Sequence, residues 1–341
     1  MTELAAIVGH FDFPRSHLAI TPLGRGLIND TWLVVSGQSV RAVLQRINRQ
    51  VFARPEQIMA NIATVSAHLA LRPDRCLRLP RLIPAREGGN FVRLGGESWR
   101  LWHYLPGVTL DKLKQPDTAK RLGWSLGRLH RLVAEIDPGL LHDTLPGFHI
   151  TSSYLQDFDR ASAGRPWERL PDLEPACTFI ERRRQRAIVL EQAGLPTRVI
   201  HGDPKLDNVL FDPETLQPLA WLDLDTIKPG SWLWDIGDCV RSACGHGGRL
   251  DLSLTAALLS GWLSEVRHLL SAAEMQLLPE AIWLLPFELG LRFLTDHLRG
   301  DRYFKVKFRG ENLKRALEQL ALVRDIERRW PDLRRLCHAR P

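Results

Sequence analysis

Cysteine is scarce in this chain, and its spacing argues against several kinds of site. Five cysteines occur among 341 residues, and none forms the Cys-x-x-Cys pair typical of zinc and redox sites. We therefore expect reduced thiols and a cytoplasmic protein. Long apolar runs are also missing, because charges interrupt each run well before the ~20 residues that a membrane span requires. The N-terminal segment lacks a basic stretch followed by an apolar core, so we expect neither secretion nor membrane insertion.

The remaining composition is that of a globular protein with excess positive charge. Hydrophobic residues make up 44% of the chain and charged residues 25%, and the length allows two lobes with separate cores. The net charge of +7 suits a nucleotide triphosphate as well as a larger polyanion. The basic residues are dispersed and no nucleic-acid motif occurs, so we expect no nucleic-acid partner. The densest basic run, residues 182–186, is typical of a solvated helix face. A monomer and a homodimer both remain open.

Apolar periodicity divides the chain into a strand-rich part and a helical part. We predict a hairpin of two strands at 28–35 and 39–47, then a helix that begins near Pro55. Further short strands are expected at 80–85, 89–94 and 99–105, before a Pro106-Gly107 break. Helices follow at 117–133, at 176–192 and from Asp235 onward, interrupted by short apolar runs at 198–200, 209–211 and 219–222. The order predicts an α+β protein with a β-rich lobe (1–103), a hinge (104–107) and a larger, mostly helical lobe (108–341).

The strongest motif is HGDPKLDN at residues 201–208, which we call the catalytic loop, followed by WLDLD at 221–225. Asp203, Lys205 and Asn208 have the spacing of a kinase catalytic loop. Phosphoryl transfer needs a carboxylate for the acceptor hydroxyl, oxygen ligands for Mg²⁺ and a cation near the γ-phosphate. We predict that Asp203 is the catalytic base and also contacts the acceptor, that Lys205 is the cation, and that Asn208 and Asp223 bind Mg²⁺.

Three neighbouring residues receive weaker predictions. Asp225 is assigned to the metal, although contact with the acceptor and a simple capping role remain open. His201 is expected to pack and hydrogen-bond in support of the catalytic loop. Asp235 is expected to bind the backbone of that loop and so to have a structural role.

Nucleotide contacts are predicted from the N-terminal lobe. Gly24, Gly26 and Asn29 precede a strand, where backbone N–H groups approach phosphates. The next strand has no lysine at the place where a protein kinase keeps its phosphate-binding lysine, so Arg46 or Gln45 takes that role. The following helix offers two candidates to support it, at positions 56 (Glu) and 61 (Asn).

These motifs resemble a known superfamily. HGDxKxxN with a following D-x-D resembles the aminoglycoside phosphotransferase and choline kinase superfamily. The blocks LINDTWLV, VLQRINRQVF, LDLDTIKPG and GLRFLTDHLRGDRYFKV are most similar to N-acetylhexosamine 1-kinases. The resemblance implies a bilobal protein-kinase-like fold, ATP as phosphoryl donor with Mg²⁺, and adenine hydrogen-bonded to the hinge backbone near Tyr104 and Leu105. Gly202 replaces the arginine of the protein-kinase His-Arg-Asp triplet, so we expect constitutive activity.

The acceptor site is predicted on the helix at 284–298. Glu288, Arg292 and Asp296 interrupt its apolar stripe at spacings of four, so they share one face. Either they form a surface salt-bridge ladder, or Arg292 and Asp296 bind a sugar. The resulting hypothesis is phosphorylation of an N-acetylhexosamine at its anomeric hydroxyl, giving a sugar 1-phosphate. Alternatives are another small alcohol, such as an aminoglycoside, choline, ethanolamine or a different sugar, and a nucleotide-binding regulator without turnover.

Overall fold

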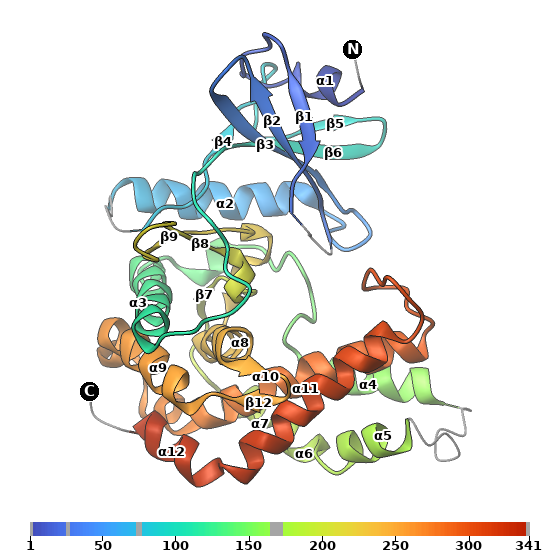
Figure 1. The fold of residues 1–341 in the computed structure, drawn as a ribbon, viewed down its shortest axis with the longest axis vertical. Coiled ribbons are helices and arrows are strands. Elements are labelled where there is room, and N and C mark those ends of the chain that lie inside the picture. The colour runs from blue at the N-terminus through green and yellow to red at the C-terminus, as the bar shows by residue number, and fades with distance from the viewer. Residues whose placement is uncertain (1–2, 25–27, 73–76, 164–172, 339–341) are drawn as a thin grey trace.

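The computed structural model describes residues 3–24, 28–72, 77–163 and 173–338. A sheet-containing N-terminal lobe stands above a larger helical lobe, as the α+β prediction requires (Figure 1). Among the predicted site residues, Gly26 lies outside the described part of the chain. None of the helices that the structure describes combines the length and the hydropathy of a bilayer span.

A six-stranded antiparallel sheet forms the N-terminal lobe. Its order is β1-β2-β3-β6-β4, and β5 pairs with β6. The bounds are β1 (Ala19–Pro22), β2 (Asp30–Ser36), β3 (Val40–Ile47), β4 (Leu82–Ile83), β5 (Val92–Leu94) and β6 (Glu97–His103), with helices α1 (Glu3–Val8) and α2 (Pro55–Ala70). One face packs on α1 through Val34, Leu44 and Leu101, and α2 runs below the sheet, between it and the helical lobe (Figure 1). The predicted β2–β3 hairpin turns at Gly37, whose φ of 61° favours glycine.

The segment after β6 is bonded to the strands that follow the catalytic loop. Val108 and Phe211 exchange two backbone hydrogen bonds of 2.9 and 2.8 Å. Gly107 is packed so tightly that a Cβ atom would lie 2.5 Å from the Leu210 side chain. The predicted Pro-Gly break is therefore a place where the chain backbone lies directly against the larger lobe.

Helices and three small antiparallel strand pairs form the larger lobe. The helices are α3 (Pro116–Val133), α4 (Thr151–Ser162), α5 (Glu174–Glu181), α6 (Arg184–Ala187), α7 (Val189–Gln192), α8 (Trp232–Cys244), α9 (Leu252–Val266), α10 (Ala272–Leu298), α11 (Glu311–Arg328) and α12 (Trp330–His338). The strand pairs are β7 (Arg198–Ile200) with β10 (Lys228–Gly230), β8 (Val209–Phe211) with β9 (Pro218–Trp221), and β11 (Gly245–His246) with β12 (Arg249–Leu250). Short 3₁₀ turns are η1 (Pro138–Leu140), η3 (Leu206–Asn208), η4 (Leu224–Thr226) and η5 (Arg267–Leu269).

The predicted helix at 176–192 is wrong as a single element, and its basic run is not simply solvated. Three short helices, α5 to α7, cover the segment. Arg183 forms an ion pair with Glu327 (2.6 Å) and stacks on the Phe179 ring. Arg186 lies over the rings of Trp283 and Trp330, at 4.3 and 4.1 Å from their centroids. These arginines join α5 and α6 to α10, α11 and α12, because a guanidinium can stack on an aromatic ring and pair with a carboxylate at once.

Candidate active site

A buried carboxylate on α8 holds the start of the catalytic loop. Asp235 accepts hydrogen bonds from the backbone N–H groups of His201 (2.7 Å) and Gly202 (2.9 Å). His130 of α3 lies 2.9 Å from the same carboxylate, and its other ring nitrogen accepts from Trp262. Since that nitrogen accepts, the imidazole is neutral and donates to Asp235. Burial raises the pKa of Asp235, but His130, His201 and the backbone N–H of Gly202 together outweigh it and the pKa is lowered.

The space around position 202 explains why this residue is glycine. Its φ is 86°, and a Cβ atom would lie 2.4 Å from the backbone oxygen of Thr226. The hydroxyl of Thr226 donates to the His201 carbonyl, which ties the two segments together. An arginine, as in the protein-kinase triplet, would therefore collide with the backbone of η4.

The catalytic loop brings its three polar side chains together. Lys205 forms a close ion pair with Asp203 Oδ2, and Asn208 Nδ2 donates to the same oxygen (3.0 Å) and to the Asp203 carbonyl (2.8 Å). Burial raises the pKa of Asp203, but Lys205 outweighs it, so the pKa stays below its usual value and the group is a carboxylate. Within the described chain no hydrogen bond occupies Asp203 Oδ1, which leaves that oxygen for an incoming hydroxyl.

His201 links this loop to the segment that carries Asp223. Its Nδ1 lies 3.3 Å from the backbone N–H of Asp203, and its Nε2 lies 2.9 Å from the Leu222 carbonyl. One nitrogen accepts and the other donates, so the ring is neutral, and burial lowers its pKa. The geometry is that of a positioning side chain, the role predicted for it.

Asp223 has the environment of a cation ligand. It adopts the left-handed conformation (φ 58°) directly after β9. Burial and then the charge of Asp225 raise its pKa to about 7, while Lys205 opposes the shift. A divalent cation would relieve this crowding of negative charge. Asn208, whose Nδ2 is used by Asp203, has its Oδ1 free of hydrogen bonds to described residues.

The residues therefore fit Mg²⁺ as part of a nucleotide complex. In the described chain no group of three or more His, Cys, Asp or Glu side chains is arranged to hold a metal. Asn208 and Asp223 offer two hard oxygen ligands, which is the protein contribution typical of magnesium that is also bound by phosphates and water. An independent, all-protein metal cage is excluded for these residues.

Asp225 is held by side chains of the N-terminal lobe, and its metal role stays a prediction. Its side chain is only 1% exposed. Arg100 Nη1 lies 2.6 Å from Oδ1, and Asn29 Nδ2 donates to Oδ2 at 2.8 Å. Both oxygens thus face the N-terminal lobe. The same contact engages the side chain of Asn29, which holds Asp225 and the Asn48 backbone, and the nucleotide contact of Asn29 stays a prediction.

Sequence reasoning missed Arg100, and it misjudged the role of the β3 side chains. Arg46 lies on the same face of β3 as Leu44, pairs with Asp30 (2.6 Å) and is 41% exposed, so the phosphate role predicted for it is wrong. Gln45 points to the opposite face, where its Oε1 accepts from Arg100 (3.0 Å) and Trp102 (2.7 Å). The cation that points toward the larger lobe is therefore Arg100 of β6. Alternation along a strand places neighbouring residues on opposite faces, and the register of β6 beside β3 was not visible in the sequence.

Helix α2 contacts the larger lobe through an amide. Asn61 is 1% exposed and donates to the carbonyls of His142 and Ile227, both at 2.8 Å. Its Oδ1 accepts from the His142 backbone. Glu56 pairs with Arg93 at the surface. Neither of these two residues pairs with Arg46, so the lobes are joined here by neutral hydrogen bonds to backbone groups.

The remaining nucleotide predictions fall on backbone that is exposed at Gly24 and half-buried at Tyr104 and Leu105. Gly24 follows β1 with φ of 78°, and a Cβ atom there would meet nothing within 4 Å. Tyr104 and Leu105 lie between β6 and Val108, and no backbone hydrogen bond to a described residue engages them. These backbone groups are therefore open to a nucleotide.

Two of the three polar residues on α10 have structural partners. Asp296 accepts from the backbone N–H groups of Arg302, Tyr303 and Phe304, at 2.9 to 3.0 Å, and from the side chain of Asn312. It is 4% exposed and also lines the cavity beside Arg292, so contact with the acceptor stays a prediction. Its carboxylate shapes the loop after α10.

Glu288, the second of these residues, belongs to a hydrogen-bond network around His149 that the sequence did not predict. His149 Nδ1 lies 2.8 Å from Glu288 Oε1, and Nε2 lies 2.8 Å from the Gly202 carbonyl. Both partners are acceptors, so both nitrogens donate and the ring is an imidazolium. Thr151 donates to the other oxygen of Glu288. The network connects α10 to the residue before Asp203, and it depends on the unusual φ of 66° at His149.

The ion pair between His149 and Glu288 predicts that the stability of the protein depends on pH. Burial lowers the pKa of His149, but Glu288 outweighs it, so the folded pKa lies above 6.5. The stabilisation is therefore complete below the unfolded pKa and is lost as pH rises through the folded value. We expect the difference in unfolding free energy between the wild type and His149→Gln to shrink between about pH 6 and 9. Urea titrations at several pH values measure it; a difference that does not change with pH would contradict the imidazolium assignment.

Arg292 lies in a cavity beside this network. The cavity has a volume of about 260 Å³ and is lined by residues from the 145–148 segment, α4, α10 and the 303–304 loop. The guanidinium lies over four aromatic rings, those of Phe148, Tyr154, Tyr303 and Phe304, at 5.1 to 5.9 Å from their centroids. The salt-bridge ladder considered for α10 does not form.

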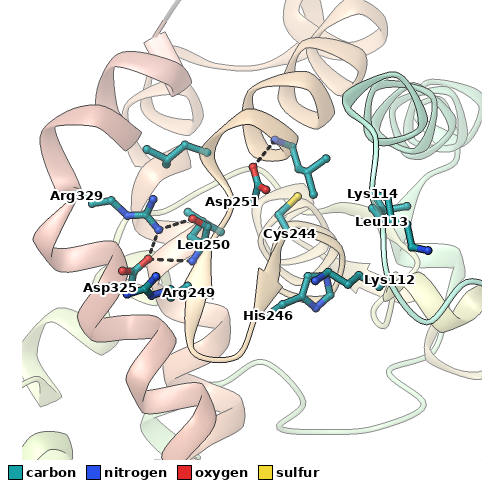
Figure 2. Close-up of a pocket in the computed structure, with 12 residues that line it drawn as sticks. Lys112, Leu113, Lys114, Cys244, His246, Arg249, Leu250, Asp251, Asp325 and Arg329 are labelled. Atoms are coloured by element: carbon teal, nitrogen blue, oxygen red, sulfur yellow. Dashed lines mark hydrogen bonds and ion pairs between the residues drawn. The ribbon is translucent and has the colours of Figure 1, made fainter.

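A larger cavity, of about 810 Å³, lies elsewhere in the helical lobe. Figure 2 shows Asp325 bonded to Arg329 and to Leu250 on one wall, and Lys112 near His246 across from it. None of the catalytic-loop residues lines it. Size alone therefore does not identify the reacting site.

Comparison with known proteins agrees with this geometry. Residues 19–270, well over half of the chain, match the family described as "Phosphotransferase enzyme family". The chain belongs to this family. Homoserine kinases of Caulobacter sp. (strain K31) and Azorhizobium caulinodans are 24% and 28% identical over 81% and 68% of this chain, covering 80% and 66% of their own lengths.

Solved structures of the phosphotransferase family share the fold. A microcompartment-associated aminopropanol kinase superposes with a TM-score of 0.74 at 20% identity, over 98% of this chain and 99% of its own. An aminoglycoside phosphotransferase from Alicyclobacillus acidocaldarius gives 0.67 at 15% identity, over 95% of each chain. The kinase-like fold is thereby confirmed. The protein is an ATP-using phosphotransferase that acts on an alcohol group of a small molecule.

Proposed function

We propose that this phosphotransferase moves the γ-phosphoryl group of Mg²⁺-bound ATP to the hydroxyl of a small molecule held between Asp203 and the Arg292 cavity. The observation that carries the proposal is the convergence of Lys205 and Asn208 on Asp203, with Asp203 Oδ1 left open. Asp203 is ionised, since its pKa is lowered, and it accepts the proton of the attacking hydroxyl. The acceptor oxygen is thus oriented at the phosphorus as its proton leaves.

Lys205 supplies fixed positive charge at the same place. Burial lowers its pKa, but Asp203 and then Asp223 outweigh this and raise it, so the ammonium stays protonated. Its charge stabilises the charge that develops on the transferring group. This stabilisation requires no movement of the Lys205 side chain, because the ion pair with Asp203 already positions the amine.

Asn208 Oδ1 and the Asp223 carboxylate are the proposed Mg²⁺ ligands. When bound, the ion neutralises charge on the β- and γ-phosphates. Asp225 acts through Asp223: its own charge raises the Asp223 pKa, and the pair with Arg100 keeps it in place. The open backbone at Gly24 and at Tyr104–Leu105 is proposed for the phosphates and the adenine.

Several acceptors are candidates. The resemblance of the 290–306 block to N-acetylhexosamine 1-kinases supports an amino sugar phosphorylated at its anomeric hydroxyl. The relatives named above point to homoserine and to an amino alcohol. Aromatic rings around Arg292 suit either a sugar face or an aliphatic chain.

The test is ADP release with Mg²⁺ and ATP across a panel of N-acetylhexosamines, homoserine, amino alcohols, aminoglycosides and choline. We expect turnover on one class and a product phosphorylated at carbon-bound oxygen by phosphorus NMR. ATP binding without ADP release for every acceptor would contradict the proposal and favour the nucleotide-binding regulator.

A further inference from the structure

Arg292 lies next to the catalytic loop. Phe148, one of its four rings, precedes His149, which is bonded to the carbonyl of Gly202. Asp203 is close enough that its charge contributes to the raised pKa of Arg292, although burial acts in the opposite direction and is the largest effect. Phe148 and His149 thus join the cavity to the start of the catalytic loop.

The guanidinium has no counter-ion among the described residues. The carboxylates around the cavity are all engaged: Asp296 by backbone N–H groups, Glu288 by His149, and Asp157 by Arg299 (2.9 Å). Within the described part of the chain, the contacts of the Arg292 guanidinium are with aromatic rings. The side chain is half-buried, and its unpartnered nitrogens are not shut off from solvent, so a ligand group can reach these donors.

Several charged side chains near the Arg292 cavity are paired with a group of opposite charge. Glu288 with the His149 imidazolium is neutral, and so are Asp203 with Lys205 and Asp157 with Arg299. Asp296 is bonded to neutral N–H groups and not to a cation, and the Arg292 guanidinium has no ion-pair partner among the described residues. A carboxylate matches it in charge and geometry, because a guanidinium binds carboxylate through two parallel hydrogen bonds. A phosphate dianion would need a second free cation at this cavity.

We propose that the acceptor alcohol carries a carboxylate group, bound by Arg292 inside the aromatic cavity while its hydroxyl meets Asp203. The inference builds on the proposed kinase function and narrows its acceptor class to hydroxy acids, hydroxy amino acids and sugar acids. Cationic acceptors such as aminoglycosides are repelled by the same guanidinium. Neutral sugars fit the rings but leave the charge unpaired.

The test compares acceptor pairs that differ only in the carboxylate: a hydroxy amino acid with its carboxamide, and a hexuronic acid with the parent hexose. Calorimetry with the wild type, Arg292→Gln and Arg292→Lys measures binding independently of turnover. The control is Arg302→Gln, an exposed arginine just beyond α10 that does not line the cavity. We expect at least one acid to bind about 10- to 100-fold more tightly than its neutral partner. Arg292→Gln should remove the difference, Arg292→Lys should restore part of it, and the control should leave it unchanged.

The outcomes separate the two proposals. Equal or tighter binding of every neutral or cationic partner, unaffected by Arg292→Gln, overturns the carboxylate inference even if that partner is phosphorylated. An acid that binds through Arg292 but is never phosphorylated supports the inference and contradicts the proposed function.

Discussion

Asp203→Asn is expected to lower kcat by about 10²- to 10⁴-fold while the affinity for ATP changes little. The amide keeps the shape of the side chain but cannot accept the proton of the attacking hydroxyl. It also removes the charge that pairs with Lys205. The effect therefore appears in the chemical step and not in nucleotide binding. Steady-state ADP release with the best acceptor of the panel gives kcat, and calorimetry gives ATP affinity.

The matched control for this variant lies four residues away. Asp207→Asn makes the same change in η3, where the side chain is exposed, and we expect its kcat to equal that of the wild type. If Asp203→Asn kept more than about a tenth of the wild-type kcat, a general-base role for Asp203 would be untenable.

Arg100→Met is expected to lower the free energy of unfolding by about 3–5 kcal/mol, because it strips Asp225 of its partner and leaves a buried carboxylate unpaired. Both side chains are 1% exposed, so water cannot replace the lost contact. Methionine keeps most of the side-chain volume. Chemical denaturation followed by tryptophan fluorescence measures the change.

Two further variants serve as controls for the effect of Arg100→Met on stability. Arg46→Met removes the exposed ion pair with Asp30 from the adjacent strand, and should cost less than about 1 kcal/mol. Arg100→Met combined with Asp225→Leu should recover part of the loss, since no buried charge remains. Equal effects of Arg100→Met and Arg46→Met would show that the Arg100–Asp225 pair does not stabilise the interface between the lobes.

The contacts between the lobes also explain why constitutive activity is expected. Protein kinases position the helix that corresponds to α2 through a lysine–glutamate ion pair that regulation forms and breaks. Here Asn61 is bonded to backbone groups of the larger lobe, and Asn29 and Arg100 both bind Asp225. All of these contacts are present without a phosphorylated activation segment. The missing arginine at position 202 agrees with this, because backbone of η4 occupies its space.

Features set by neighbouring residues were predicted well. The β2–β3 hairpin, α2, α3 and the short strands around the catalytic loop follow from alternation, helical periodicity and turn residues. Helix α10 was located correctly, but the partners of Glu288 and Asp296 were not predicted, because spacing by four shows a shared face and not what that face meets. The short helices α5 to α7 were merged, since apolar periodicity alone does not mark breaks between them.

The sequence by itself determined the catalytic loop and its position ahead of Asp223, because their contacts span few residues and the spacing of the motif sets them. Only the tertiary structure decided which side chains complete the site. Asn29 meets Asp225 across 196 positions, and His149 meets Glu288 across 139. Strand register decided that Arg100 and not Arg46 points inward, and the packing of α4 against α10 left Arg292 without a counter-ion. Such pairings depend on how distant elements pack, and no local pattern of residue types records them.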